Sequence, residues 1–134
     1  MDPKYLSRVD AHALVFGGSG GIGREVVRAL VANGAHAVTF TYDRDASKAA
    51  LEHNVRHLGY PYRPDVRVLG VAPGWVDTPL NATLPEDERK DVQGRIWLQR
   101  FGDPAEIAKV VAFLAGTGGS FATGTTIVVN GGFR

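Results

Sequence analysis

The glycine-rich segment at residues 17–23 constrains the fold of this chain more than any other feature. The apolar run at residues 13–16 before it is typical of a buried strand, and residues 24–33 after it are typical of a helix. Glycines between a strand and a helix let the backbone turn tightly and approach a pyrophosphate. The free N–H groups at the helix start then face that anion. The segment therefore predicts a turn that binds the phosphates of a dinucleotide.

Strands and helices alternate along the chain, which predicts an α/β fold built on parallel strands. We expect strands at residues 11–16, 37–42, 66–72 and 125–129, and helices at residues 22–33, 46–58 and 104–115. A further helix should follow a capping box at residues 83–86 and run to Asp91 or Gln93, and residues 103–106 form a second capping box. The apolar faces predicted to turn inward comprise Ile22, Val26, Val27, Leu30 and Val31 in the first helix and Ile107, Val110, Val111 and Leu114 in the last.

Composition narrows the classes of function. The 134 residues suffice for one domain with its own core, so we expect a single domain over residues 1–134. The net charge is +1 and the arginines are scattered, so the sequence shows no basic stripe that would indicate binding to nucleic acid or a membrane surface. The absence of cysteine excludes disulfides and cysteine metal sites, and His53 and His57 lack a third ligand, so we expect no metal. No apolar run approaches the roughly 20 residues that span a bilayer, and no signal-peptide core is present, so we expect a cytoplasmic protein.

Three segments in sequence order resemble the short-chain dehydrogenase/reductase family. Gly17, Gly21 and Gly23 fall on the glycines of its Thr-Gly-x-x-x-Gly-x-Gly motif, with Phe16 in the place of the threonine. Residues 73–79 match the segment on the nicotinamide side, and residues 100–107 and 125–132 complete the match. The resemblance implies a Rossmann-like three-layer sandwich. Because strands of the family are missing here, it implies a reduced parallel sheet of about four strands in the order second, first, third, fourth (2-1-3-4).

The resemblance also implies a cofactor site. The backbone at Val76 and the hydroxyl of Thr78 would hold the nicotinamide carboxamide. Arg44 stands where many members carry the cation that meets the 2′-phosphate of NADP, which favours NADP over NAD; a solvated surface arginine is the alternative. Ser19 would either donate to phosphate or stabilise the turn. The candidate cofactor-binding residues are Gly17, Ser19, Gly20, Gly21, Ile22, Gly23, Arg44, Pro73, Gly74, Val76 and Thr78.

The catalytic Tyr-x-x-x-Lys pair of the family has no counterpart in this sequence. The tyrosines are Tyr5, Tyr42, Tyr60 and Tyr62, and none is followed four residues later by lysine. The family's Asn-Asn-Ala-Gly motif is also absent, and the chain passes almost directly from the helix ending near residue 59 to the strand before Pro73. We therefore assign no catalytic residue.

Three functions remain open at this point. The chain could be a dinucleotide-binding protein without the family's catalysis. It could be an NADP-dependent oxidoreductase whose interior lies outside this chain or is supplied by a partner. It could be a structural, assembly or engineered protein that binds no cofactor. Because the family often pairs subunits through its last helix and strand, we expect a homo-oligomer through residues 104–115 and 125–129. The substrate is not predicted.

Overall fold

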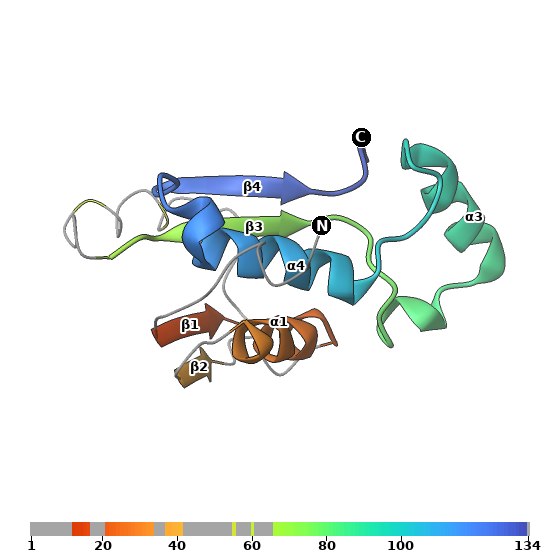
Figure 1. The fold of residues 1–134 in the computed structure, drawn as a ribbon. Helices are drawn as coiled ribbons and strands as arrows, with labels where there is room; N and C mark the ends of the chain where they lie inside the picture. The colour runs from red at the N-terminus through yellow and green to blue at the C-terminus, as the bar shows by residue number, and fades with distance from the viewer. Residues whose placement is uncertain are drawn as a thin grey trace, which may run out of the picture.

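The structure is a computed structural model, which describes residues 12–16, 21–33, 37–41, 55, 60 and 66–133. Strands and helices alternate in it as expected for an α/β fold (Figure 1). The strands are β1 (His12–Phe16), β2 (Ala37–Thr41), β3 (Leu69–Pro73) and β4 (Thr125–Val129). The α-helices are α1 (Gly21–Ala32), α3 (Glu86–Arg95) and α4 (Pro104–Ala115), and two short 3-10 segments are Asn81–Thr83 and Thr117–Gly119. The helix predicted at residues 46–58 lies outside the described residues, except for Val55, which is helical and buried.

The strands pair in parallel, as the alternation predicted. β1 pairs with β2, from His12 opposite Ala37 onward. β3 pairs with β4, from Leu69 opposite Thr125 onward. These are the first and last pairings of the predicted order 2-1-3-4. The predicted link between β1 and β3 is wrong for the described residues, which form two separate two-stranded sheets.

Helix packing, rather than strand pairing, joins the two strand pairs in the described residues. α1 contacts β1 and β2, α4 contacts β3, and α1 and α4 lie side by side. Packed helices have axes about 8–10 Å apart, whereas hydrogen-bonded strands are about 4.8 Å apart. Two helices can therefore touch while the strands beneath them remain too far apart to pair.

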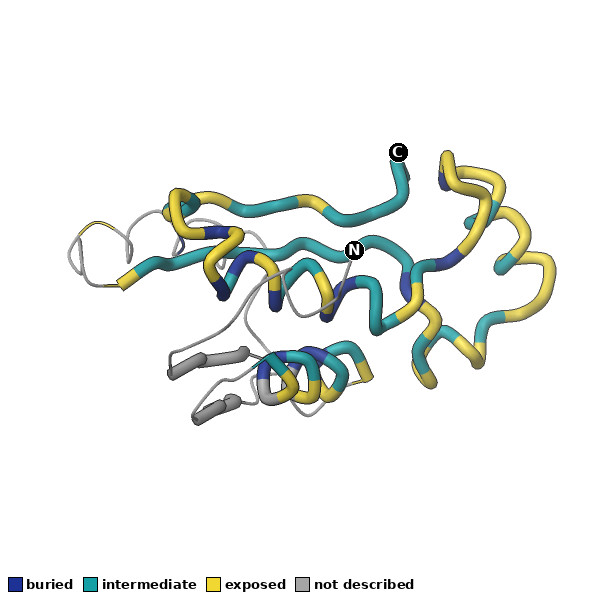
Figure 2. The backbone as a smooth tube through the Cα atoms, viewed as in Figure 1, coloured by how far each residue is buried: buried dark blue, intermediate teal, exposed yellow. Residues whose placement is uncertain are grey.

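The core of the described residues lies at the contact between α1 and α4 (Figure 2). Val26 and Leu30 are buried there, and Ile22 is partly buried, so these three confirm the face predicted for α1. The side chains of Val27 and Val31 lie outside the described set.

The inward face of α4 differs in part from the predicted one. Ile107 and Leu114 are buried as predicted, and Val111 is partly buried and packs against the core, as predicted; Val110 is only half-buried. The remaining buried positions on this helix are Ala108 and Ala112. Small side chains such as Ala108 at the contact allow α1 to approach closely.

Local capping signals succeed at one helix and fail at another. At α4 the Asp103 side chain accepts from the Ala105 N–H at 2.7 Å, and the Glu106 side chain accepts from the Asp103 N–H at 2.8 Å, which confirms the capping box. At α3 the residue before the helix is Pro85, without a side-chain cap. The predicted box at residues 83–86 is therefore wrong: Thr83 donates instead to the Leu80 carbonyl. α3 also continues to Arg95, past the predicted end.

β3 begins three residues later than predicted, because Arg67 in the preceding segment is bonded to the end of α4. The Arg67 guanidinium donates to carbonyl groups at the C-terminal end of α4 and in the following turn, at 2.7 Å for Leu114 and 2.8 Å for both Ala115 and Gly119. Pro73, predicted to end the strand, is its last paired residue, opposite Val129. No helix of the described part is long and apolar enough to traverse a bilayer.

Candidate functional site

The structure brings two of the predicted site segments together. The loop after β3 reaches the first residue of α1, where Thr78 and Pro79 lie over Gly21. A Cβ atom built on Gly21 would lie 3.3 Å from Cγ2 of Thr78 and 3.5 Å from Cδ of Pro79. A side chain at Gly21 would therefore crowd the loop, so glycine permits this approach.

The candidate residues divide into three groups. Gly21, Ile22 and Gly23 form the first turn of α1, and Gly23 is buried. Four more candidates follow or end β3 in the second segment: Pro73, Gly74, Val76 and Thr78. The third group lies outside the described residues and comprises Gly17, Ser19, Gly20 and Arg44.

Gly74 allows the chain to leave β3 close to the end of β4. Its N–H donates to the Val129 carbonyl at 3.0 Å. A Cβ atom at this position would lie 2.6 Å from Cβ and 2.7 Å from Cα of Asn130, closer than packed atoms tolerate. Glycine is thus required here by the approach of two strand ends.

Val76 is fixed by contacts with the segment that opens α4. Its side chain is 2% exposed, and its backbone forms a parallel bridge with Gly102. Two hydrogen bonds flank this bridge, from the Asp77 N–H to the Gly102 carbonyl at 2.8 Å and from the Gly102 N–H to the Trp75 carbonyl at 2.9 Å. The backbone of this loop is therefore held in one conformation on the side away from α1.

Thr78 presents a hydroxyl at the meeting point with α1. Its carbonyl accepts from the N–H groups of Asn81 and Ala82, both at 2.9 Å, which begins the 3-10 segment. The side chain is half-buried, and within the described residues no hydrogen bond is made by its hydroxyl. The Cγ2 methyl of Thr78 lies toward Gly21, and the hydroxyl on the same side chain is a hydrogen-bonding group.

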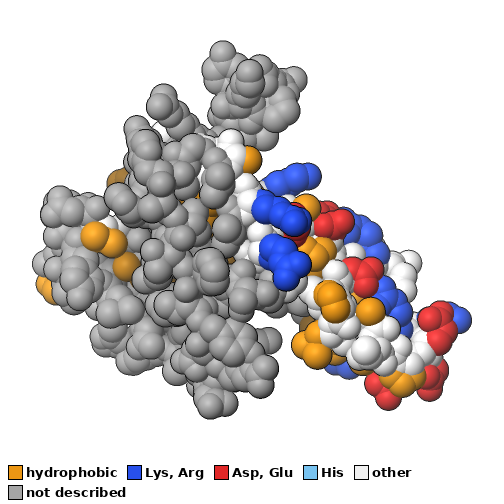
Figure 3. Space-filling model, turned by 90° about the horizontal axis from the view of Figure 1, so that it is seen from below, with side chains coloured by type: hydrophobic (Ala, Val, Ile, Leu, Met, Phe, Trp, Pro, Cys, Tyr) orange, Lys and Arg blue, Asp and Glu red, His pale blue; other side chains and the backbone are white. Residues whose placement is uncertain are grey.

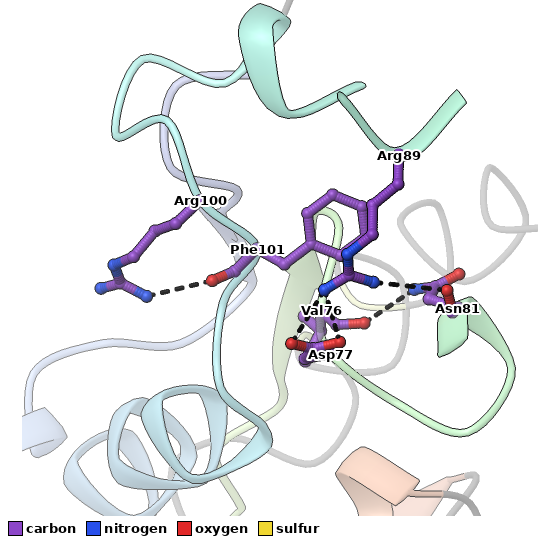
Figure 4. A network of polar contacts seen from close by, with 6 residues as sticks. All are labelled: Val76, Asp77, Asn81, Arg89, Arg100 and Phe101. Atoms are coloured by element: carbon purple, nitrogen blue, oxygen red, sulfur yellow. Dashed lines mark hydrogen bonds and ion pairs between the residues drawn. The ribbon is translucent and has the colours of Figure 1, made fainter. Parts of the chain in front are cut away.

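A charged network from α3 holds the same loop, and sequence reasoning missed it (Figure 4). Arg89 donates to both carboxylate oxygens of Asp77, at 2.9 and 3.0 Å, and its guanidinium carbon lies 4.3 Å from the centre of the Phe101 ring. Asn81 donates from Nδ2 to the Val76 carbonyl at 2.7 Å. The charged run that contains Arg89 is typical of a solvated helix face. The one signal in the sequence was Asp77, an acidic residue within residues 73–79 that could pair with an arginine.

A second ion pair lies where the loop meets α4. Arg100 donates to both carboxylate oxygens of Glu106, and Arg100 with Val76 and Trp75 lines a cavity of about 90 Å³. The hydrogen bonds from Arg100, followed by that from the Asp103 N–H, lower the pKa of Glu106 to about 2. Acidic and basic side chains mix over the described part of the face in Figure 3, so no single charge sign dominates it.

The described part of the site offers groups suited to binding. Backbone N–H groups at the start of α1, the backbone at Val76 and the Thr78 hydroxyl are hydrogen-bonding groups. Across the described ranges, no group of three or more acidic or histidine side chains could hold a metal ion. The arrangement places the start of a helix against the loop that follows a parallel strand.

Comparison with known proteins identifies the family. The family described as enoyl-(acyl carrier protein) reductase matches residues 42–134, well over half of the chain. The chain belongs to the short-chain dehydrogenase/reductase family, in agreement with the resemblance carried by its motifs.

The curated relatives are reductases and dehydrogenases of greater length. The chain is 46% identical over 88 residues to the 3-oxoacyl-(acyl-carrier-protein) reductase FabG of Pseudomonas aeruginosa, covering 65% of this chain and 36% of that protein. It is 39% identical over 89 residues to the cis-4-hydroxycyclohexanecarboxylate dehydrogenase of Sinomonas cyclohexanicum, covering 66% of this chain and 36% of that protein. The chain thus spans about a third of the length of these relatives.

Solved structures share the fold. A short-chain dehydrogenase/reductase from Brucella melitensis aligns with a TM-score of 0.78 at 19% identity, over 92% of this chain and 96% of that one. The RhlG/NADP active-site complex of Pseudomonas aeruginosa aligns with a TM-score of 0.78 at 17% identity, over 99% of both chains. At these identities the likeness establishes the Rossmann-type fold.

Proposed function

We propose that this chain binds a nicotinamide dinucleotide, NADP(H) in preference to NAD(H), between the start of α1 and the loop after β3. The observation that carries the proposal is the contact of Thr78 with Gly21, which joins two motifs distant in sequence. Membership of a family of reductases and the fold shared with a protein solved as an NADP complex support it.

The residues present fit such a group. The N–H groups of the first turn of α1, from Gly21 to Gly23, would face the pyrophosphate. The Val76 backbone and the Thr78 hydroxyl would hold the carboxamide, and the absence of a side chain at Gly21 lets Thr78 approach the start of α1. The proposal extends to Gly17, Ser19 and Gly20, which lie outside the described residues, and to Ile22 in the first turn of α1, all beside the phosphates. Arg44 would stand at the 2′-phosphate, and Pro73 would order the loop.

The proposed role is binding without the family's own catalysis. A bound nicotinamide cofactor supplies or accepts a hydride, and reduction of a carbonyl also requires a positioned proton donor. This sequence has no tyrosine with a lysine four residues later, so no residue is assigned to that proton transfer. The chain would hold the cofactor within one domain, residues 1–134.

A second candidate is an oxidoreductase completed by another chain. It is favoured by the length of the match, about a third of each curated relative. Turnover of a carbonyl compound with NADPH, appearing only when a second polypeptide is added, would favour this candidate over the first.

We also propose that two copies associate through α4 and β4. Phe113 on α4 and Val128 on β4 are 43% and 62% exposed, and Phe121 between these elements is fully exposed. Burial of such apolar side chains between subunits would stabilise a dimer. Sedimentation equilibrium of the chain at several concentrations tests this, and a monomer throughout would contradict it.

Calorimetric titration of the purified, mass-verified chain with NADPH and NADH tests the binding proposal. We expect saturable binding that Thr78→Val weakens by about tenfold or less, the value of one hydrogen bond. Arg44→Ala should weaken NADPH more than NADH, because only NADPH carries the 2′-phosphate. Thr125→Val, an exposed threonine on β4, is the matched control and should bind as the unmodified chain does. No binding at millimolar cofactor would contradict the proposal and favour a structural role.

A further inference from the structure

Helix α3 is held by side chains rather than by a core of its own. None of its residues is buried, and three acidic residues occupy its first turn. It lies beyond the ends of β3 and β4 (Figure 1), where Arg89 reaches back to the loop after β3 (Figure 4). The position of α3 relative to that loop therefore depends on polar contacts, and Arg89 makes several of them, with Asp77 and Asn81 (Figure 4).

The contacts of Arg89 converge on the loop. Its guanidinium donates to both oxygens of Asp77, stacks on Phe101, which is 7% exposed, and lies 3.5 Å from the Asn81 carbonyl oxygen. Asp77 and Asn81 lie on either side of Thr78 in sequence. Arg89 thus contacts the loop both before and after Thr78, the residue that lies against the start of α1.

We propose that Arg89 is a positioning residue for the dinucleotide site: through Asp77 and Asn81 it holds Thr78 in place at the start of α1. The inference rests on the proposed function and deepens it, because it makes α3 the element that sets the geometry of the nicotinamide side. Arg89 itself does not touch the cofactor.

The network is separable from the stability of the fold. The Asp77 side chain is 56% exposed, and ion pairs so open to water add little to the free energy of folding. The bridge between Val76 and Gly102 is formed by backbone atoms and does not involve Arg89. Loss of Arg89 should therefore loosen the loop around Thr78 while the protein stays folded.

The first test separates the two halves of the cofactor. NADPH probes the whole site, and adenosine 2′,5′-bisphosphate probes the adenosine half, which carries no nicotinamide. We expect Asp77→Asn to weaken NADPH binding by about twofold to fivefold, the scale of an exposed ion pair, and Arg89→Gln to weaken it at least as much, because Arg89 also contacts Asn81 and Phe101. The double variant should be no worse than Arg89→Gln alone, because Arg89→Gln already removes the partner of Asp77. Affinity for the bisphosphate should not change.

Lys90→Gln provides the matched control on the same helix. Lys90 forms an ion pair with Glu86 within α3 at 3.4 Å, and both side chains are about three-quarters exposed. It removes the same charge as Arg89→Gln and should leave both affinities unchanged. Any of three outcomes would overturn the inference: an equal loss of affinity for NADPH and the bisphosphate, additive losses of NADPH affinity in the double variant, or a matching loss in Lys90→Gln.

The second test does not depend on the cofactor. The N–H groups of Asn81 and Ala82 donate to the Thr78 carbonyl, so their hydrogen exchange reports the order of this turn. Arg89→Gln should speed exchange at both amides by several-fold, and Lys90→Gln should not. If the unmodified chain fails to bind NADPH, the proposed function fails, and this exchange alone decides whether Arg89 positions the loop. Unchanged exchange would overturn that role, and Asp77→Asn serves if Arg89→Gln does not fold.

Discussion

Arg100 and Glu106 form a two-point ion pair across the first turn of α4, with Nη1–Oε2 and Nη2–Oε1 distances of 2.7 Å each. The same carboxylate accepts from the Asp103 N–H at 2.8 Å and so completes the capping box. One side chain therefore orders the helix start and fixes the segment that carries Phe101 and Gly102 against the loop after β3.

This pair predicts a specific loss of stability in acid. The Arg100 hydrogen bonds and then the Asp103 N–H lower the pKa of Glu106 from 4.5 to about 2. Because the folded pKa lies below the unfolded one, this contribution to the free energy of unfolding is complete above about pH 4.5 and is lost as the pH falls toward 2. Urea midpoints measured at constant ionic strength should fall less over this range in Glu106→Gln than in the unmodified chain. Glu88→Gln on the exposed face of α3 should retain the full fall; an identical profile in all three proteins would contradict the assignment.

Two glycine substitutions should act in opposite directions. Gly74→Ala places a Cβ 2.6 Å from that of Asn130, so it should destabilise by about 2 kcal/mol through overpacking and spread the ends of β3 and β4. Gly94→Ala on α3 meets no atom within 4 Å and should stabilise by about 0.5–1 kcal/mol, because alanine favours helix. Denaturant unfolding checks both, and equal effects of the same sign would show that backbone approach does not decide the outcome at Gly74.

The contact between α1 and α4 should dominate the stability of the described part. Leu30 is 1% exposed there, so Leu30→Ala should lower the free energy of unfolding by about 3 kcal/mol. Leu80 is 81% exposed, and Leu80→Ala should change it by less than about 0.5 kcal/mol. Thermal and urea unfolding of the two variants test this difference. Similar small losses would mean that the helix contact is not the main core.

Arg67 should matter more than other arginines for the C-terminal end of α4. Its two terminal nitrogens reach the carbonyls of Leu114 and Ala115, which the helix itself leaves unpaired. Arg67→Gln should cost about 2 kcal/mol, the scale of hydrogen bonds to a charged group. Arg28→Gln, which removes an exposed pair with Glu25, should cost less than about 0.5 kcal/mol. The urea midpoints give the comparison, and the assignment fails if both variants unfold alike.

Local signals predicted the elements that depend on neighbouring residues. α4 begins at Pro104 and ends at Ala115 as expected, because Asp103 caps it and Gly116 follows it. The same reasoning failed at Thr83, since Pro85 keeps an extended backbone with ψ of 147° and delays the helix until Glu86. A capping-box sequence therefore caps a helix only where the backbone conformation allows the side chain to reach the helix N–H groups.

Long-range relationships were harder to predict from the sequence. The family motifs predicted that the α1 start and the loop after β3 serve one site, and the structure places Thr78 against Gly21. The pair of Arg89 with Asp77 depends on how the chain turns between them, which no periodic pattern specifies. The separation of the two sheets is likewise not specified by the sequence of any strand.

The seam between α1 and α4 also bears on how the two strand pairs are held together. Strands joined by a ladder must match residue for residue, whereas apolar side chains such as Leu30 and Ala108 meet without a shared register of hydrogen bonds. The two strand pairs are therefore joined across this seam by apolar side chains, and the position of one pair relative to the other is set by how closely those side chains pack.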